Sequence, residues 1–345
     1  MDDSSLDDNI SNMKSNQVIL FEKRPEGKPV MDDFRFVEEE IPAVNDGQVL
    51  LKTLYVSVDP YLRGRMTAAK SYIAPFELGK PLASALVAVV AESKNDNFKE
   101  GDYVTGSLDW KQFQLSDGKA LRKIEAAEDQ LSAYLGVLGM TGLTAYFGLM
   151  EIAKPQAGET MVVSGAAGAV GSIVGQIGKT LGCRVIGIAG SDEKVALLKN
   201  QFGFDEAINY NTTTDMAGAI AAAAPNGVDV YFDNVGGEIS DAVLKHINRF
   251  ARIPVCGAIA SYNDTKADLG PRVQTTLVKN SALMQGFIVG NYQEKFAEGI
   301  SQLSNWLTAG KIVGTETIVE GFDQIPQAFI DLFDGKNSGK MIVKV

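Results

Sequence analysis

The chain has 345 residues, enough for about two domains, and its 45% hydrophobic and 22% charged residues are near the averages of folded globular proteins. A net charge of -11, without any cluster of Lys and Arg, argues against nucleic acid and anionic membranes as partners. Two uncharged stretches, 131–150 and 160–178, reach membrane-spanning length. Both are interrupted by Gly and mixed with Ser and Thr, so we expect neither to cross a membrane.

One His and two Cys limit the chemistry that the chain can perform. A structural zinc site takes four Cys or His ligands and a catalytic site takes three protein ligands, so we expect no metal site. A Ser-His-Asp triad would depend on His246, which lies in a stretch expected to be helical, and no nucleophile elbow accompanies it. Cys183 and Cys256 are too few for a disulfide scaffold. Two unpaired thiols and the lack of a signal peptide predict a cytoplasmic protein.

The N-terminal part of the chain has the pattern of β-strands. Residues 1–14 are acidic, polar and without periodicity, and we expect them to form a disordered tail. From Gln17 to Val104, short apolar runs such as QVILF and SALVAVVAE are separated by Pro and Gly. This pattern predicts a small β-rich domain.

After Leu131 the pattern changes to strands that alternate with segments of helix length, which predicts a parallel sheet with crossover helices. The expected strands are 160–164, 184–189, 206–209, 228–233, 251–256 and 283–289. The expected helices between them are 170–181, 193–202, 215–223 and 239–248. Six strands in this alternation are typical of a doubly wound dinucleotide-binding fold.

The C-terminal segment predicts an amphipathic helix over 293–307, a strand over 311–320, a helix over 322–333 and a final strand over 340–345. A final strand needs a sheet to join, and the β-rich N-terminal half is its natural host. We therefore expect a discontinuous domain built from 15–135 and 311–345. A second domain, 136–310, would then be inserted in the first.

A glycine-rich turn, in VVSGAAGAVGS at 162–172, follows the first strand of the alternation. Gly165, Gly168 and Gly171 would let the backbone approach a pyrophosphate, whose charge meets the free amides and positive dipole end of the next helix. Glycine-rich turns of this kind also occur where they bind no ligand and merely allow a strand and a helix to pack closely. Because this turn opens a six-strand alternation, the sequence predicts a dinucleotide site.

The residues at the end of the second strand of such a fold distinguish an NAD site from an NADP site. NAD sites place an acidic residue there for the ribose 2'-hydroxyl, whereas a 2'-phosphate needs a cation and small polar neighbours. The strand ends in Gly190 and Ser191, and Lys194 follows one helical turn later. Asp192 and Glu193 would then be first-turn helix residues with Ser191 as the N-cap. This interpretation favours NADP, although Lys194 could also be a solvated helix residue.

Longer motifs carry a family resemblance. In chain order they are SVDPYLRGRM (57–66), GVLGMTGLTAYFGL (136–149), SGAAGAVGSIVGQIGK (164–179), AGSDEK (189–194), DNVGG (233–237), RIPVCGAIASYN (252–263), QGFIV (285–289) and GKNSGKMIV (335–343). The chain resembles the zinc-independent medium-chain dehydrogenase/reductases, and within them the leukotriene 12-hydroxydehydrogenase/prostaglandin reductase group, especially its bacterial curcumin reductase-like members. The resemblance implies an α/β fold: a Rossmann NADP-binding domain, with a doubly wound parallel sheet, inserted in a β-rich GroES-like catalytic domain.

The resemblance also implies NADPH as cofactor and the residues that line it. Gly168, Ala169, Val170 and Gly171 match positions at the pyrophosphate, and Lys194 and Tyr210 match positions at the 2'-phosphate. Other cofactor-lining matches are Asn234, Cys256, Gly257, Ala258, Ile259, Tyr262, Phe287, Ile288, Val289 and Asn337. Each has a purely structural alternative; Cys256 also suits a core position and Asn337 a turn.

The chemistry that the resemblance implies is hydride transfer from the nicotinamide to the β-carbon of an α,β-unsaturated ketone or aldehyde. Negative charge then develops on the carbonyl oxygen, which needs a hydrogen-bond donor but no metal. Tyr262 matches the active-site tyrosine of the family, and the ribose hydroxyl of the cofactor is an alternative donor. Tyr55 is a weaker candidate that would shape the pocket.

Two rival functions stay open at the level of sequence. One is a zinc-free NADPH quinone oxidoreductase, and the other is a non-catalytic NADPH-binding protein. For the enzyme we expect a small-molecule enone or enal as the substrate, and a homodimer joined through edge strands of the Rossmann sheet as a fold analogy. The loop over 263–280 varies among relatives, so the size of the substrate is left open.

Overall fold

The computed structural model describes residues 15–345, so the tail expected over 1–14 lies outside the described residues. The chain divides into two compact units. The first contains the chain up to Leu135 together with Ile318–Asp334 and Met341–Val345, and the second contains Gly136–Thr317 and Gly335–Lys340. Each unit is thus assembled from separated stretches of the sequence.

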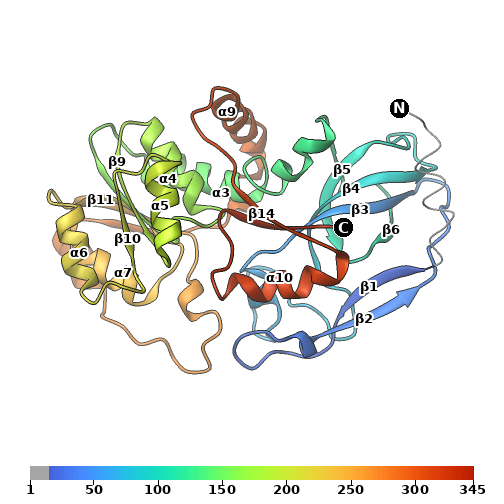
Figure 1. Ribbon diagram of the computed structural model, residues 1–345, viewed down its shortest axis with the longest axis horizontal. Coiled ribbons are helices and arrows are strands. Elements are labelled where there is room, and N and C mark those ends of the chain that lie inside the picture. Colours follow the sequence, from blue (N-terminus) through green and yellow to red (C-terminus); the bar gives the residue numbers. More distant parts are fainter. Residues whose placement is uncertain (1–14) are drawn as a thin grey trace. The chain divides into compact units, whose positions relative to one another are not determined.

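The first unit is built on antiparallel strands, of which those from the N-terminal part of the chain are drawn in blue to teal and β14 in dark red in Figure 1. Strand β1 (Asn16–Phe21) pairs with β2 (Phe34–Glu39). A seven-stranded sheet has the order β14-β15-β3-β4-β5-β7, and β6 also pairs with β3. Its strands are β3 (Val49–Ser57), β4 (Ala83–Ser93), β5 (Tyr103–Asp109), β6 (Phe113–Ser116), β7 (Arg122–Ile124), β14 (Glu316–Glu320) and β15 (Lys340–Lys344). Ile342 of β15 is paired with Ser57 of β3, which confirms that the last strand joins the N-terminal sheet.

The core of the first unit draws on both ends of the sequence. Phe21, Trp110 and Phe329 belong to one apolar cluster and are fully buried, and Phe329 comes from helix α10 (Ile325–Leu332). The Trp110 Nε1 atom donates to Ser84 Oγ at 2.8 Å, so the burial of the indole leaves its polar atom paired. Helix α10 therefore completes the core that the N-terminal strands begin.

The second unit contains six parallel strands in the order β10-β9-β8-β11-β12-β13. They are β8 (Thr160–Ser164), β9 (Arg184–Ala189), β10 (Glu206–Asn209), β11 (Val228–Phe232), β12 (Ile247–Val255) and β13 (Leu283–Gly286). Counted along the chain, this is the order 3-2-1-4-5-6 of a doubly wound sheet. The predicted fold class is confirmed.

Crossover helices connect these strands, as Figure 1 shows in green to orange. They are α4 (Gly171–Thr180), α5 (Asp192–Asn200), α6 (Met216–Ala223) and α7 (Gly237–Leu244). Ile220 of α6 and Val243 of α7 are buried in a cluster with strand residues such as Ile186. One face of the sheet is therefore covered by α6 and α7. Within residues 15–345, no helix has the length and apolar character that crossing a membrane requires.

The largest difference from the expected elements follows α7. The helix predicted over 239–248 ends at Leu244, and β12 begins at Ile247. Ile247 pairs with Val228 and is buried, and the Asn248 side chain donates to Asp229 at 2.8 Å. These contacts with a neighbouring strand override the local helical pattern. His246 consequently lies between the two elements, not in a helix.

Several helices within residues 15–345 were not predicted. Helix α3 (Met140–Phe147) continues into a π-helix, η3 (Gly148–Ala153), and helix α8 (Gln274–Asn280) occupies the end of the segment expected to be a loop. The predicted strands over 311–320 and 283–289 are shorter in the structure, as β14 and β13. The helix predicted over 293–307 is η5 (Val289–Lys295) followed by α9 (Phe296–Thr308). The remaining short helices are η1 (Met31–Asp33), α2 (Leu62–Arg65), η2 (Glu128–Tyr134), η4 (Ile259–Ser261) and η6 (Phe322–Gln324).

Candidate functional site

The glycine-rich turn joins the carboxyl end of β8 to helix α4. Gly165 has a φ of 58°, a conformation that favours glycine. A Cβ on Gly171 would lie 2.3 Å from the Gly165 carbonyl oxygen and 2.8 Å from the Cα of Ala166. Because both of these are backbone atoms, no side chain fits at position 171. The turn needs glycine to bring its backbone this close to the start of the helix.

The same turn leaves hydrogen-bond donors available for an anion. Ser172 N and Gly168 N donate within the turn, to the carbonyl oxygens of Gly168 and Gly165. The amides of Ala169, Val170 and Gly171 have no backbone acceptor outside α4 within residues 15–345. Three amides at the N-terminus of a ten-residue helix suit a pyrophosphate, whose charge the helix dipole also favours. The observed turn thus fits a dinucleotide.

At the end of β9 the structure places the acidic residues in the first turn of α5. Ser191 Oγ accepts a hydrogen bond from Lys194 N at 3.2 Å, so Ser191 is the N-cap, as predicted. The Asp192 carboxylate accepts from the Asn209 side chain at 2.7 Å. Asp192 is therefore held by its neighbour on β10.

Tyr210 lies against Gly190 at the end of β9, and Lys194 lies in the first turn of the helix that follows, α5. A Cβ on Gly190 would lie 2.7 Å from the Tyr210 hydroxyl, which shows that this hydroxyl covers the end of β9. Lys194 Nζ donates to the Gly335 carbonyl oxygen at 2.6 Å, and burial lowers the pKa of this lysine. An amine and a phenolic hydroxyl are both groups that can donate hydrogen bonds to a phosphate.

The segment that contains Asn337 lies against the glycine-rich turn. Gly339 N donates to the Ala167 carbonyl oxygen at 2.7 Å, and Gly339 forms a bridge with Gly168. The Asn337 side chain donates to the Gly339 carbonyl oxygen at 2.7 Å. The structure therefore brings the predicted residues of the glycine-rich turn, Lys194 and Asn337 into one neighbourhood of the second unit.

The ends of β11 and β12 hold the next predicted residues. Asn234 follows β11 and is tied to the end of β8, because its backbone N donates to Ser164 Oγ at 3.0 Å and its side chain donates to the Ser164 carbonyl oxygen at 2.8 Å. Cys256 and Gly257 follow β12, and both of their amides bond to the Asp233 carbonyl oxygen. The carboxyl ends of three neighbouring strands, β8, β11 and β12, are joined in this way.

The Tyr262 side chain contacts the backbone that follows the end of β12. Its hydroxyl oxygen accepts from Ala258 N at 3.3 Å, and a Cβ on Gly257 would lie 3.0 Å from it. Ile259 begins the short helix η4, which places Tyr262 directly after it. Burial raises the pKa of the Tyr262 hydroxyl, so the group keeps its proton at neutral pH and can donate it in a hydrogen bond.

The last predicted segment follows β13. The ring of Phe287 packs edge-on against Phe232, with centroids 6.2 Å apart, and a Cβ on Gly148 would lie 2.8 Å from the Phe287 ring. Ile288 is 38% exposed, and Val289 begins η5. Tyr55, in contrast, lies on β3 of the first unit, where it packs against an apolar cluster.

Two features of this region escaped the sequence interpretation. One is the buried carboxylate of Asp233, which was placed at the end of an expected strand and given no role of its own. The other is the π-helix at Gly148, where a Cβ would lie 2.5 Å from the ring of Phe232. The pattern DNVGG could have drawn attention to Asp233, since an acidic residue directly after a buried strand requires partners.

We expect both cysteine thiols to react slowly with a thiol reagent in the native protein. Burial raises the pKa of Cys256 to about 12 and that of Cys183 to about 11. At pH 8 the thiolate fraction should be roughly 100-fold or more below that of a free cysteine. Titration with Ellman's reagent should therefore show two fast-reacting thiols only after denaturation. A fast-reacting thiol in the native protein would contradict this environment.

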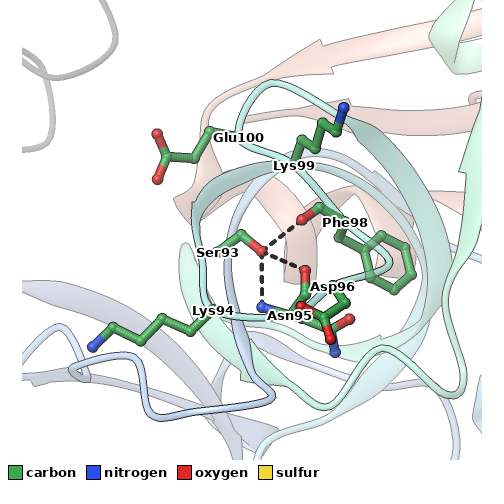
Figure 2. Close-up of a pocket in the computed structure, with 7 residues that line it drawn as sticks. All are labelled: Ser93, Lys94, Asn95, Asp96, Phe98, Lys99 and Glu100. Atoms are coloured by element: carbon green, nitrogen blue, oxygen red, sulfur yellow. Dashed lines mark hydrogen bonds between the residues drawn. The ribbon is translucent and has the colours of Figure 1, made fainter.

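A separate hollow lies in the loop after β4 (Figure 2). It is an open depression of about 520 Å³ lined by Ser93, Lys94, Asn95, Asp96, Phe98, Lys99 and Glu100. Ser93 Oγ donates to the Phe98 carbonyl oxygen at 2.7 Å and accepts from Asn95 N at 3.2 Å, as the dashed lines in Figure 2 show. These bonds close the turn on itself, and the charges around it are of both signs. We interpret it as a structural turn.

Comparisons with known proteins agree with the fold. Two family models match the chain, "N-terminal domain of oxidoreductase" over residues 17–124 and "Zinc-binding dehydrogenase" over residues 169–305. Despite the second description, no group of three or more His, Cys, Asp or Glu side chains within residues 15–345 is placed to hold a metal ion.

Two relatives and one solved structure match almost the whole chain. The putative NADP-dependent oxidoreductase YfmJ of Bacillus subtilis is 58% identical over 96% of this chain and 98% of its own. The NADPH-dependent curcumin reductase of Escherichia coli is 41% identical over 96% of this chain and 97% of its own. The crystal structure of CurA from Vibrio vulnificus in complex with NADPH is 41% identical, covers 95% of this chain and 99% of that chain, and has a TM-score of 0.91. The chain therefore belongs to the medium-chain dehydrogenase/reductase family, in the group that contains the bacterial curcumin reductases.

Proposed function

We propose that this chain reduces the carbon-carbon double bond of α,β-unsaturated ketones and aldehydes, with NADPH as the hydride donor. It is an NADP-dependent oxidoreductase, as its relatives are named. The observation that carries the proposal is the arrangement at the carboxyl edge of the parallel sheet. Three kinds of group follow neighbouring strands there. They are backbone donors for a pyrophosphate, a lysine and a tyrosine for a phosphate, and a second, protonated tyrosine.

Binding of the cofactor would use groups that the fold already holds in place. The amides of Ala169, Val170 and Gly171 would take the pyrophosphate, and Lys194 and Tyr210 would take the 2'-phosphate. When bound, NADPH supplies the hydride. The tie between Asp192 and Asn209, at 2.7 Å, would keep the acidic side chain from the phosphate. A lysine in place of an acidic partner favours NADPH over NADH.

Tyr262 would act on the substrate side of the reaction. Delivery of hydride to the β-carbon moves negative charge onto the carbonyl oxygen, and a hydrogen-bond donor aimed at that oxygen stabilises the enolate. The Tyr262 hydroxyl accepts a bond from Ala258 N, and its own proton has no acceptor within residues 15–345. This proton is available to an oxyanion. Water can then protonate the α-carbon.

We further propose that the first unit is the GroES-like catalytic domain and the second the NADP-binding domain, with Tyr55 shaping the substrate pocket. The boundaries proposed from sequence are 15–135 with 311–345, and 136–310. This assignment places the cofactor residues in the unit that holds the doubly wound sheet. Tyr55 packs against Val87 and Ile342 of the neighbouring strands, which fixes its position on β3.

A substrate panel tests the proposed reaction. We expect oxidation of NADPH with a linear enal and with an aryl enone such as curcumin, and far weaker activity when NADH replaces NADPH. Turnover with a quinone alone would replace the proposal with a quinone reductase. Tight NADPH binding without turnover of any compound in the panel would indicate a binding protein.

We also propose that the enzyme is a homodimer that pairs through β13. This strand is the last of the six-stranded sheet, and its residue Leu283 is 45% exposed. In the segment that precedes β13, Leu269 and Val278 are 88% and 80% exposed, and an uncovered strand edge favours pairing with a second copy. Analytical ultracentrifugation should find a mass near 74 kDa, twice the 36.9 kDa of the chain. A monomer at micromolar concentration would contradict the dimer.

A further inference from the structure

A buried carboxylate lies at the centre of the candidate site. Asp233 directly follows β11 and is 2% exposed. Its Oδ1 atom accepts from Ser164 Oγ at 3.1 Å, Tyr231 Oη at 2.9 Å, Val235 N at 3.0 Å and Gly236 N at 2.9 Å. Its Oδ2 atom accepts from Ser240 Oγ at 2.8 Å. Five donors offset the cost of burying a charged group, so the carboxylate is built into the fold.

Four of these donors are close to Asp233 in the sequence, and Ser164 is 69 residues away. Ser164 ends β8, Val235 and Gly236 form the turn into α7, and Ser240 lies on that helix. The backbone of Asp233 connects a third strand, β12, to β8 and β11. Its carbonyl oxygen accepts from Cys256 N at 2.8 Å and Gly257 N at 3.3 Å, and its amide donates to the Pro254 carbonyl oxygen at 3.0 Å. One residue thus joins the carboxyl ends of β8, β11 and β12.

The turn that Asp233 holds cannot adjust on its own. Gly236 and Gly237 have φ values of 71° and 56°, which other residues rarely adopt. A Cβ on Gly236 would lie 3.3 Å from the Cβ of Ala258, so the β11 turn packs directly on the β12 turn. A shift of either turn would therefore move the other.

We propose that Asp233 is a positioning residue for the cofactor, one that fixes the turns bearing Asn234, Gly257 and Ala258 before NADPH binds. The inference rests on the proposed function, because it assigns these turns to the cofactor. Asp233 itself is covered by its five donors and acts through the backbone amides of Val235 and Gly236.

The same strand offers a matched control. Asp229 lies near the amino end of β11, where its carboxylate accepts from Thr160 N at 2.9 Å and from the Asn248 side chain at 2.8 Å. It also joins neighbouring elements, β8 and β12. Ligands of doubly wound sheets bind at the carboxyl ends of the strands, so Asp229 serves the fold at the end opposite the ligand.

The experiment compares Asp233→Ala with Asp229→Ala and uses two measurements without substrate. The first is the Kd of NADPH from fluorescence titration, and the second is hydrogen exchange of the apo protein over residues 234–240. We expect Asp233→Ala to raise the Kd about 30-fold and to speed exchange at Val235 and Gly236. Asp229→Ala should keep the Kd within about threefold of the wild type. Asp233→Asn preserves the shape and removes the charge, so it should raise the Kd about fivefold, and it replaces the alanine variant if that variant does not fold.

Three outcomes would overturn the inference, and a fourth would instead overturn the proposed function. A wild-type Kd in the Asp233 variants would overturn it, and so would equal losses of affinity in the Asp229 and Asp233 variants. If the wild-type protein itself did not bind NADPH, the proposed function would fail. The exchange rates of Val235 and Gly236 would then still show whether Asp233 fixes the turn. Unchanged exchange at these two amides in Asp233→Ala or Asp233→Asn would overturn the positioning role by itself.

Discussion

Replacing Lys194 with Ala should raise the KM for NADPH about 50-fold and leave the KM for NADH within about threefold. A hydrogen bond between a lysine and a phosphate is charge-assisted, and such bonds contribute about 1.5–3 kcal/mol, or roughly a 10- to 150-fold change in affinity. NADH has no 2'-phosphate, so it gains nothing from the lysine. Steady-state kinetics with both cofactors at one enone concentration measure the two KM values.

A neighbouring lysine supplies the control for this variant. Lys199 lies on the same helix, α5, and forms an exposed ion pair with Glu206 at 3.2 Å. Lys199→Ala removes the same charge from the helix and should leave both KM values unchanged. If the two variants raised the KM for NADPH equally, Lys194 would act only through its positive charge and not through a bond to the 2'-phosphate. A loss of NADH affinity in Lys194→Ala as large as that of NADPH would show that its bond to Gly335 serves the fold instead.

Replacing Tyr262 with Phe should lower kcat about 100-fold and leave the Kd of NADPH within about threefold. Removal of one donor from an oxyanion site typically costs 100- to 1,000-fold in kcat, and a ribose hydroxyl could recover part of this loss. The ring would stay in place, since the one bond of the hydroxyl within the described part of the chain comes from Ala258 N at 3.3 Å. Tyr146→Phe, which removes a hydroxyl bonded to Glu298, is the matched control.

The pH profile adds an independent test of Tyr262. In the proposed role its protonated form is the active one, and burial raises its pKa above the ordinary value of 10.0. The alkaline fall in the wild-type kcat should therefore have its midpoint above pH 10, as the phenolate forms. An unchanged kcat in Tyr262→Phe would show that Tyr262 does not stabilise the enolate. If kcat fell in Tyr55→Phe and not in Tyr262→Phe, that role would belong to Tyr55.

Local patterns predicted the glycine-rich turn and the cap of α5 because the residues of each are neighbours in the sequence. The turn Gly165–Gly171 and the cap at Ser191 each fit within a few residues, so spacing and side-chain size reveal them. The parallel sheet with its crossover helices likewise follows from the alternation of strands and helices. The placement of Lys194 beside Gly335, 141 residues away, was beyond such patterns.

The features that were missed depend on long-range contacts. Asp233 is satisfied by Ser164, 69 residues earlier, and no local pattern contains that pair. The π-helix begins at Gly148, which packs on Phe232, the last residue of β11, and on Phe287, which follows β13. The helix predicted through Asn248 ends early because Ile247 is buried against Val228. In each case the tertiary partner, and not the local propensity, decides the structure.

The most direct test of the proposed reaction follows the hydride itself. NADPH labelled with deuterium at the transferred position of the nicotinamide should be incubated with the enzyme and an aryl enone. Nuclear magnetic resonance of the product should show the label on the β-carbon of a saturated ketone. A label on the former carbonyl carbon, in an allylic alcohol, would contradict reduction of the carbon-carbon double bond.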